Sequence, residues 1–208
     1  MTEIRSGAML GVRACERSLP NRSERIERGI GMGSKESCCF TGHRILPAGE
    51  LPALRAALRR EISNLAEAGV GRFLAGGARG FDMLAAQEVL WLREERYALE
   101  LVLVLPCPEQ ADRWNARERQ AYREMVQEAD EVIYVSEVYT PDCMFRRNRK
   151  LVEESGSCIC YLNRERGGTA YTVKYAEKLG LSIVNLAVPR PNSAAQELSL
   201  IHISEPTR

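Results

Sequence analysis

The 208-residue sequence contains no apolar run near the roughly 18 residues that a membrane-spanning helix needs. Its first residues also lack the compact apolar core of a secretory signal. The formal net charge is only +1, so the chain has no strong field of one sign for coating nucleic acid or anchoring to a membrane surface. We therefore expect a cytoplasmic protein with no membrane partner.

Metal ligands are also scarce. The seven cysteines include no C-x-x-C pair, and the two histidines, His43 and His202, are far apart. An odd number of cysteines, most of them inside apolar runs, is typical of reduced thiols that fill a core. The sequence therefore predicts no metal site.

Two terminal segments differ from the rest of the chain. Residues 1–31 contain six arginines and four acids without helical or strand periodicity, so we expect this segment to be disordered or to precede the true start at Met32. Residues 198–208 look like a translated sequencing adapter and are excluded from the fold. The predicted domain covers residues 32–197.

Between these ends, short apolar runs alternate with amphipathic stretches. The predicted strands cover 38–41, 73–75, 99–105, 132–135, 157–162 and 181–186. The predicted helices cover about 50–68, 83–96, 109–129, 140–154 and 170–180. This alternation predicts a Rossmann-like three-layer α/β domain, with a mainly parallel sheet of about six strands and helices on both faces.

A glycine-rich turn, Gly76-Gly77-Ala78-Arg79-Gly80-Phe81-Asp82, joins the second strand to its helix. The first N–H groups of a helix are unpaired, and Gly76, Gly77 and Gly80 would let a phosphate approach them. The alternative is that these glycines only relieve steric crowding. Arg79 would pair with the phosphate or face solvent, and Asp82 would cap the helix or bind a ribose hydroxyl.

Other loops are expected at the same sheet edge. Thr41, Gly42, His43 and Arg44 follow the first strand and could supply a hydroxyl, an imidazole and a guanidinium to the same anion, although a catalytic His43 is not favoured. A second glycine turn, Gly167-Gly168-Thr169, could grip the other end of a nucleotide. The basic run 146–150 is interpreted as a solvated helix face, except that Asn148 could read a base or hold a loop.

Several of these stretches, taken in order, resemble the YpsA-like branch of the SLOG superfamily, which is named for the SMF/DprA and Lonely-guy proteins. The stretches that carry the resemblance are 39–44, 76–82, 106–110 with Trp114, 139–148 and 168–169. The resemblance covers about residues 37–186. It implies a Rossmann-like domain that binds nucleotides or nucleotide-derived signals.

Two relatives within that superfamily frame the alternatives. The turn at 76–82 is similar to the glycine turn of DprA, which binds single-stranded DNA. The near-neutral charge of this chain argues against the same DNA binding here. Lonely-guy enzymes release a base from nucleoside monophosphates with a P-G-G-x-G-T-x-x-E motif. Here Arg166 precedes the glycines, Ala170 replaces the third glycine, and Val173 and Lys174 stand where acids belong.

The sequence therefore predicts a binding or sensor protein for a nucleotide or an ADP-ribose-like derivative, without a further cofactor. An N-glycosidic hydrolase and a single-stranded DNA-binding protein are the alternatives. We do not expect nucleic acid as the partner, and a homo-oligomer is left open. The expected ligand-binding residues are Thr41, Gly42, His43, Arg44, Gly76, Gly77, Arg79, Gly80, Asp82, Asn148, Gly167, Gly168 and Thr169.

Overall fold

The computed structural model describes residues 35–187. The expectations for residues 1–31 and 198–208 concern segments outside this range. The boundaries of the predicted domain, 32–197, also lie outside it and remain predictions.

Six strands form one sheet in the order β4-β3-β2-β1-β5-β6, and each of its five pairings is parallel. The strands are β1 (Ser37–Gly42), β2 (Arg72–Ala75), β3 (Glu100–Leu105), β4 (Glu131–Tyr134), β5 (Ser157–Tyr161) and β6 (Ser182–Asn185). The chain adds strands in one direction from β1 to β4 and then crosses back to place β5 on the other side of β1. The predicted parallel α/β fold is confirmed.

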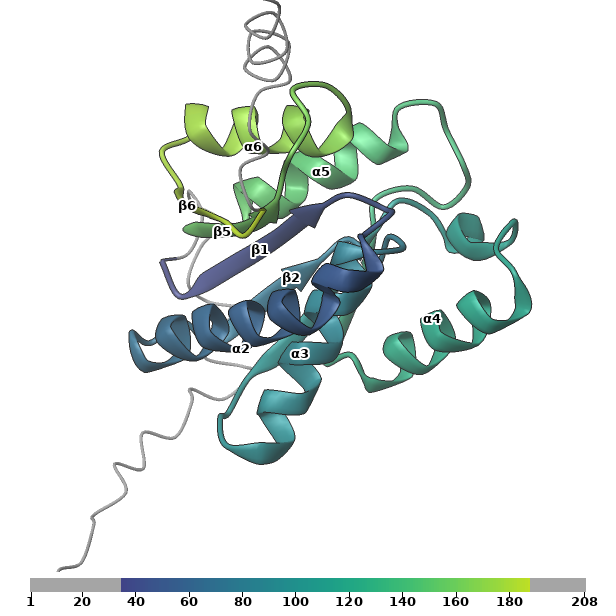
Figure 1. The fold of residues 1–208 in the computed structure, drawn as a ribbon. Helices are drawn as coiled ribbons and strands as arrows, with labels where there is room; N and C mark the ends of the chain where they lie inside the picture. The colour runs from purple at the N-terminus through teal and green to yellow at the C-terminus, as the bar shows by residue number, and fades with distance from the viewer. Residues whose placement is uncertain (1–34, 188–208) are drawn as a thin grey trace, which may run out of the picture. The chain divides into compact units, whose positions relative to one another are not determined.

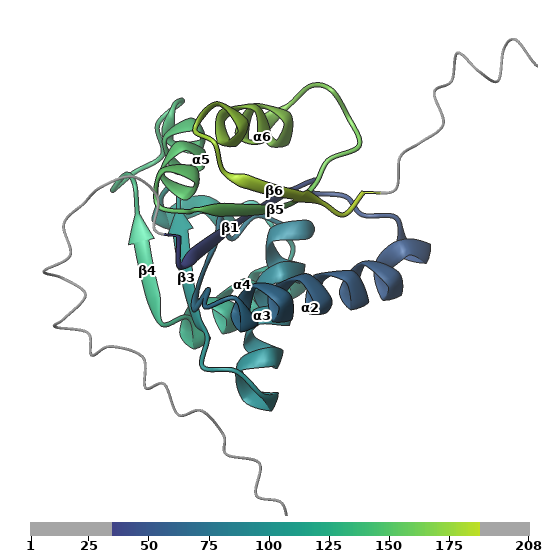
Figure 2. The ribbon, with the colours of Figure 1, turned by 90° about the vertical axis from the view of Figure 1, so that its left-hand side faces the viewer.

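The helices lie between the strands in the chain (Figure 1). They are α2 (Leu51–Glu67), α3 (Phe81–Glu95), α4 (Ala116–Glu128), α5 (Cys143–Glu153) and α6 (Gly168–Lys178), with short 3-10 helices η1 (Ala48–Glu50) and η2 (Pro108–Ala111). Figure 2 shows α2, α3 and α4 on one face of the sheet and α5 and α6 on the other. The three layers of the prediction are therefore present.

The helix predicted over 109–129 was wrong at its start. Residues 108–111 form η2, and α4 begins only at Ala116. Asn115 caps α4, because its side chain accepts a hydrogen bond from the backbone N–H of Glu118 while the Glu118 carboxylate accepts one from Asn115 N–H. This reciprocal capping box is a strong helix start, and it prevails over the charged pattern that precedes it.

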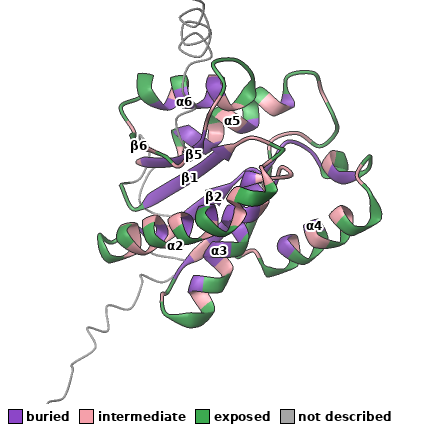
Figure 3. Cartoon of the chain, in the orientation of Figure 1, coloured by how far each residue is buried: buried purple, intermediate pink, exposed green. Residues whose placement is uncertain are grey.

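Each face of the sheet carries its own apolar core, because side chains alternate between the two faces of a strand. On β3, Leu101, Leu103 and Leu105 pack on the α2–α3–α4 side, whereas Val102 and Val104 pack on the α5–α6 side. Figure 3 shows the central strands mostly buried. Burial on both faces explains why β3 reads as a nearly continuous aliphatic run.

Candidate functional site

A small cavity lies where the loops after β1, β2 and β3 meet α5. Its volume is about 60 Å³, and its seven lining residues are Arg44, Ala78, Arg79, Gln110, Trp114, Met144 and Arg147. Ligands of open α/β sheets bind beyond the carboxyl ends of the strands near the point where the strand order reverses, and here that point is β1. Three arginines and no acid line this cavity, so it suits an anion.

A wider and more open hollow of about 430 Å³ lies beside β4, at the sheet edge. It is lined by residues 134–138 and Arg146. We place the candidate site in the smaller cavity because two of its lining residues, Gln110 and Arg147, carry buried polar atoms without partners in the described chain.

The glycine turn beside the cavity is tightly packed. Arg147 Nη1 donates a 2.6 Å hydrogen bond to the Gly76 carbonyl, and a Cβ on Gly76 would stand 1.5 Å from that nitrogen. Gly80 has φ +81°, and a Cβ there would lie 2.5 Å from the carbonyl oxygens of His43 and Arg44. Glycine is therefore required at both positions by the protein's own packing.

The amides at the start of α3 mostly have backbone acceptors. Phe81 N–H donates to the His43 carbonyl at 3.1 Å, Met83 N–H to the Ala78 carbonyl at 3.2 Å, and Leu84 N–H to the Gly80 carbonyl at 3.0 Å. Three of the first four N–H groups of α3 are thus already used. An anion in this cavity would depend on arginine side chains more than on an open cradle of amides.

Asp82 and Arg147 form a buried ion pair that joins α3 to α5. Arg147 Nη1 lies 3.3 Å from Asp82 Oδ2, and only 6% of Arg147 and 5% of Asp82 are exposed. Burial raises the pKa of the Asp82 carboxyl, while the Arg147 guanidinium and the N–H groups of Ala78 and Gly42 oppose that rise. The Asp82 carboxylate therefore faces Arg147, which was not among the expected site residues.

Two polar atoms of lining residues have no hydrogen-bond partner within the described part of the chain. They are Nε of Arg147, a donor, and Oε1 of Gln110, an acceptor. Gln110 Nε2 donates a 2.7 Å hydrogen bond to the Gly77 carbonyl, so the other end of this amide is the one left unpaired. Buried polar atoms without partners are uncommon, and two in one cavity indicate a place for a ligand.

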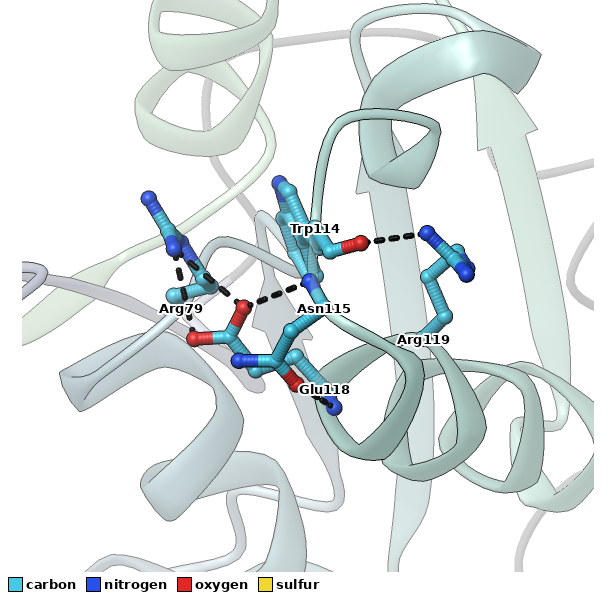
Figure 4. A network of polar contacts seen from close by, with 5 residues as sticks. All are labelled: Arg79, Trp114, Asn115, Glu118 and Arg119. Atoms are coloured by element: carbon cyan, nitrogen blue, oxygen red, sulfur yellow. Dashed lines mark hydrogen bonds and ion pairs between the residues drawn. The ribbon is translucent and has the colours of Figure 1, made fainter.

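Arg79 connects the glycine turn to the start of α4. Its Nη1 lies 3.2 Å from Glu118 Oε1, and its guanidinium stands 5.6 Å from the centre of the Trp114 ring. Figure 4 shows the Glu118 carboxylate between Arg79 and the Asn115 backbone, so the same acid pairs with Arg79 and closes the capping box. Figure 4 also shows Arg119 donating to the Trp114 carbonyl, which fixes the segment that carries the tryptophan.

The loop after β1 supplies one side of the cavity. Arg44 is exposed and lines the cavity, whereas Thr41 is buried within the sheet. His43 Nε2 accepts a 3.1 Å hydrogen bond from Asn163 N–H, which ties the loop after β1 to the loop after β5. Gly42 packs so closely on α3 that a Cβ there would lie 2.4 Å from the Phe81 side chain.

The second glycine turn lies at the start of α6, and none of its residues lines the cavity. Gly167 is the N-cap of α6 and forms no side-chain cap hydrogen bond, with Gly168 and Thr169 in the first turn. Asn148 lies beside it, with Nδ2 3.9 Å from the position of a Cβ on Gly168. The expected site residues therefore fall into two groups, one around the cavity and one around the start of α6.

Five lining residues were missing from the expected set: Ala78, Gln110, Trp114, Met144 and Arg147. The interpretation of the basic run 146–150 as a solvated face was wrong for Arg147, which is buried. Helical spacing could have found it, because Cys143, Arg147 and Leu151 are four residues apart and all buried on one face of α5. No comparable local signal identifies Gln110 or Met144.

In residues 35–187, no group of three histidine, cysteine, aspartate or glutamate side chains is placed to hold a metal ion. No helix there is long and apolar enough to cross a membrane.

Curated relatives match more than half of the chain. A UPF0398 protein of Bacillus pumilus is 29% identical over 130 residues, which is 61% of this chain and 70% of the relative. The prophage-derived protein YoqJ of Bacillus subtilis is 28% identical over 119 residues, which is 51% of this chain and 70% of the relative.

Solved structures share the fold at low sequence identity. DNA processing protein A from Helicobacter pylori, described with a single-stranded DNA binding mode, matches with a TM-score of 0.53, 16% identity, and coverage of 82% of this chain and 77% of that one. DprA from Streptococcus pneumoniae matches with a TM-score of 0.53, 13% identity, and coverage of 80% of this chain and 56% of that one.

The family model described as the YspA SLOG family, YpsA, matches residues 46–182. That range begins after β1, ends at the first residue of β6, and includes every residue that lines the cavity except Arg44. The chain therefore belongs to the YpsA branch of the SLOG family.

Proposed function

We propose that the chain binds a nucleotide or a phosphorylated nucleotide derivative and acts as a ligand sensor. The observation that carries this proposal is the cavity lined by Arg44, Arg79 and Arg147, in which buried Arg147 keeps one N–H without a partner. The ligand's phosphate would satisfy that donor with a charge-assisted hydrogen bond.

Energetic arguments support an anionic ligand group. A buried donor without an acceptor costs about 1–3 kcal/mol, so a phosphate oxygen at Arg147 Nε removes a penalty as well as adding a bond. Asp82 neutralises part of the Arg147 charge, and Glu118 does the same for Arg79. Arg44 adds a third positive charge at the cavity.

The size of the cavity limits which part of the ligand it encloses. A volume of about 60 Å³ holds a few water molecules or one phosphate group, but not a whole nucleotide. The sugar and base would therefore lie outside, where the half-buried Trp114 offers an aromatic surface.

The hydrolase alternative requires a carboxylate that is free to move a proton at the glycosidic bond. Asp82 is held by Arg147, and Glu118 is held by Arg79 and the Asn115 backbone. The two acids that pair with arginines of the cavity are thus engaged in structural pairs, which favours binding over turnover. Free base released from a nucleoside monophosphate by purified protein would favour the hydrolase instead.

The test is a calorimetric titration with AMP, ADP-ribose and a single-stranded DNA oligonucleotide. We expect a nucleotide to bind, and Arg44→Met to weaken that affinity about tenfold, or ~1.4 kcal/mol. Arg149→Met is the matched control, because Arg149 lies on exposed α5 surface against Tyr171, outside the cavity. We expect it to leave affinity unchanged.

Equal effects of the two substitutions would contradict the proposed site. Binding of DNA with a steep loss of affinity in salt, and no binding of either nucleotide, would favour the single-stranded DNA alternative, because phosphate contacts release counterions.

A further inference from the structure

Gln110 places a hydrogen-bond acceptor among the arginines of the cavity. Its Nε2 donates to the Gly77 carbonyl at 2.7 Å, which fixes the orientation of the amide, since the opposite orientation would set two oxygens against each other. Oε1 is then left buried, and no residue of the described chain donates to it. Two residues that line the cavity therefore carry buried atoms without partners in the described chain: an acceptor, Gln110 Oε1, and a donor, Arg147 Nε.

This combination narrows the class of anion that fits. A sulfate or a fully ionised phosphate carries only acceptor oxygens, so it satisfies Arg147 and leaves Gln110 Oε1 without a donor. A phosphate that keeps a proton carries acceptor oxygens and a P–OH donor together. An unmet acceptor in a buried site costs as much as an unmet donor, so the anion with a proton is preferred.

We propose that Gln110 Oε1 accepts a hydrogen bond from the P–OH of the ligand's terminal phosphate, while Arg147 binds one of its charged oxygens. Gln110 thereby makes the site specific for a phosphate that retains a proton. This assignment rests on the proposed function and narrows its ligand to one that ends in a phosphomonoester, bound as the monoanion, since the two phosphates of ADP-ribose are diesters and carry no P–OH near pH 7. Each of the two atoms exposes less than 1 Å² to solvent, so binding of the phosphate requires a lining side chain to move aside.

The experiment compares inorganic phosphate with sulfate by amide NMR titration at pH 7 and constant ionic strength. Every inorganic phosphate species near that pH keeps at least one P–OH, whereas sulfate has none. Sulfate carries at least as much negative charge, so attraction to arginines alone does not favour phosphate. We expect wild type to bind phosphate about tenfold more tightly than sulfate.

The variant Gln110→Met keeps the side-chain length and removes the acceptor. We expect its preference for phosphate to fall below about threefold, while its affinity for sulfate stays close to that of wild type. The matched control is Tyr122→Phe, because the Tyr122 hydroxyl is also buried without a partner and its ring packs against the same Gly77. We expect Tyr122→Phe to keep the preference for phosphate.

The outcomes separate the two proposals. Equal binding of both anions by wild type overturns the role of Gln110 and leaves the anion site standing, whereas binding of neither contradicts the proposed function as well. Equal loss of both anions in Gln110→Met shows that Gln110 only supports the glycine turn. Loss of the preference in Tyr122→Phe assigns the acceptor to the Tyr122 hydroxyl instead.

Discussion

At the scale of single residues, the pair Asp82–Arg147 holds the site together. Arg147 comes from α5, and its Nη1 contacts both the Asp82 carboxylate of α3 and the Gly76 carbonyl of the glycine turn. Both side chains are nearly inaccessible to water, so each charge depends on the other for its stability. The pair therefore sets the position of the donor, Arg147 Nε, that faces the expected phosphate.

We expect Asp82→Asn to lower the free energy of unfolding by about 3–5 kcal/mol, because it leaves a buried guanidinium unpaired. Arg147→Met should lower the free energy of unfolding by a similar amount, because it leaves the buried Asp82 carboxylate unpaired. The double variant should lose clearly less than the sum of the two single losses, since it buries neither charge. Urea unfolding measures all three, and costs that add within about 0.5 kcal/mol would show that the two residues are independent.

The sequence could predict one half of this pair. Gly76–Asp82 is visible as a glycine turn between a strand and a helix, and Asp82 was expected to serve the site. Arg147 sits in a basic run with Arg146 and Arg149, both of which are exposed, so composition suggested a solvated surface. Its burial depends on α5 packing against the glycine turn, which is a contact between residues 71 positions apart.

At the scale of elements, the start of α4 and the glycine turn share one acid. Glu118 accepts from Asn115 N–H in the capping box and pairs with Arg79. The stability of the α4 N-terminus and the charge that Arg79 offers to a ligand thus both depend on the Glu118 carboxylate. Two substitutions can separate these two effects.

Glu118→Gln should keep the capping box, since glutamine also serves at that position, and should release Arg79 from its acid. We expect the affinity for a phosphorylated ligand to rise about threefold, in keeping with the small strength of a partly exposed ion pair. Asn115→Ala should instead lower stability by about 1 kcal/mol with little change in affinity. Calorimetric titration and urea unfolding check the two effects, and a fall in affinity for Glu118→Gln would contradict the link.

Strand and helix positions were largely predictable, because local periodicity records which faces are buried. The nearly continuous aliphatic run of β3 and the apolar stripe of α2, where Leu54, Leu58 and Ile62 are buried, both indicated the correct element. The start of α4 was placed too early because η2 and the loop after it carry the same charged pattern as a helix surface. The Asn115–Glu118 spacing is itself a capping signal in the sequence, and it marks the observed start of α4.

At the scale of the whole described domain, the order of the strands could not be predicted. The sequence indicated parallel pairing, but the crossing from β4 to β5 places strands distant in the chain on either side of β1. That arrangement depends on which apolar faces pack together, and local patterns do not record it.

Buried thiols make the domain sensitive to high pH. The six described cysteines are all buried, and burial raises the pKa of Cys107 to about 11 and that of Cys160 to about 12. An unfolded thiol ionises near pH 8.5, so above that pH the unfolded state holds fewer protons than the folded state and is favoured. Stability should fall by about 1.4 kcal/mol per pH unit for each such thiol until its folded pKa is reached.

Urea unfolding between pH 7 and 10.5 measures this loss, and Cys107→Ala should reduce its slope. A free energy of unfolding that stays constant between pH 8.5 and 10.5 would be inconsistent with thiols that remain protonated in the folded state.

The central position of β1 also has a consequence for protein synthesis. Ser37 at the start of β1 is bridged by the side chain of Ser157 at the start of β5, 120 residues later. While the chain leaves the ribosome, β1 to β4 can assemble as a half-sheet whose β1 edge stays uncovered until β5 emerges. The arginine that completes the cavity arrives with α5, immediately before that strand. Nascent chains that end before residue 143 should therefore lack the anion site even where β1 to β4 have paired, so a ligand would stabilise only chains long enough to include α5.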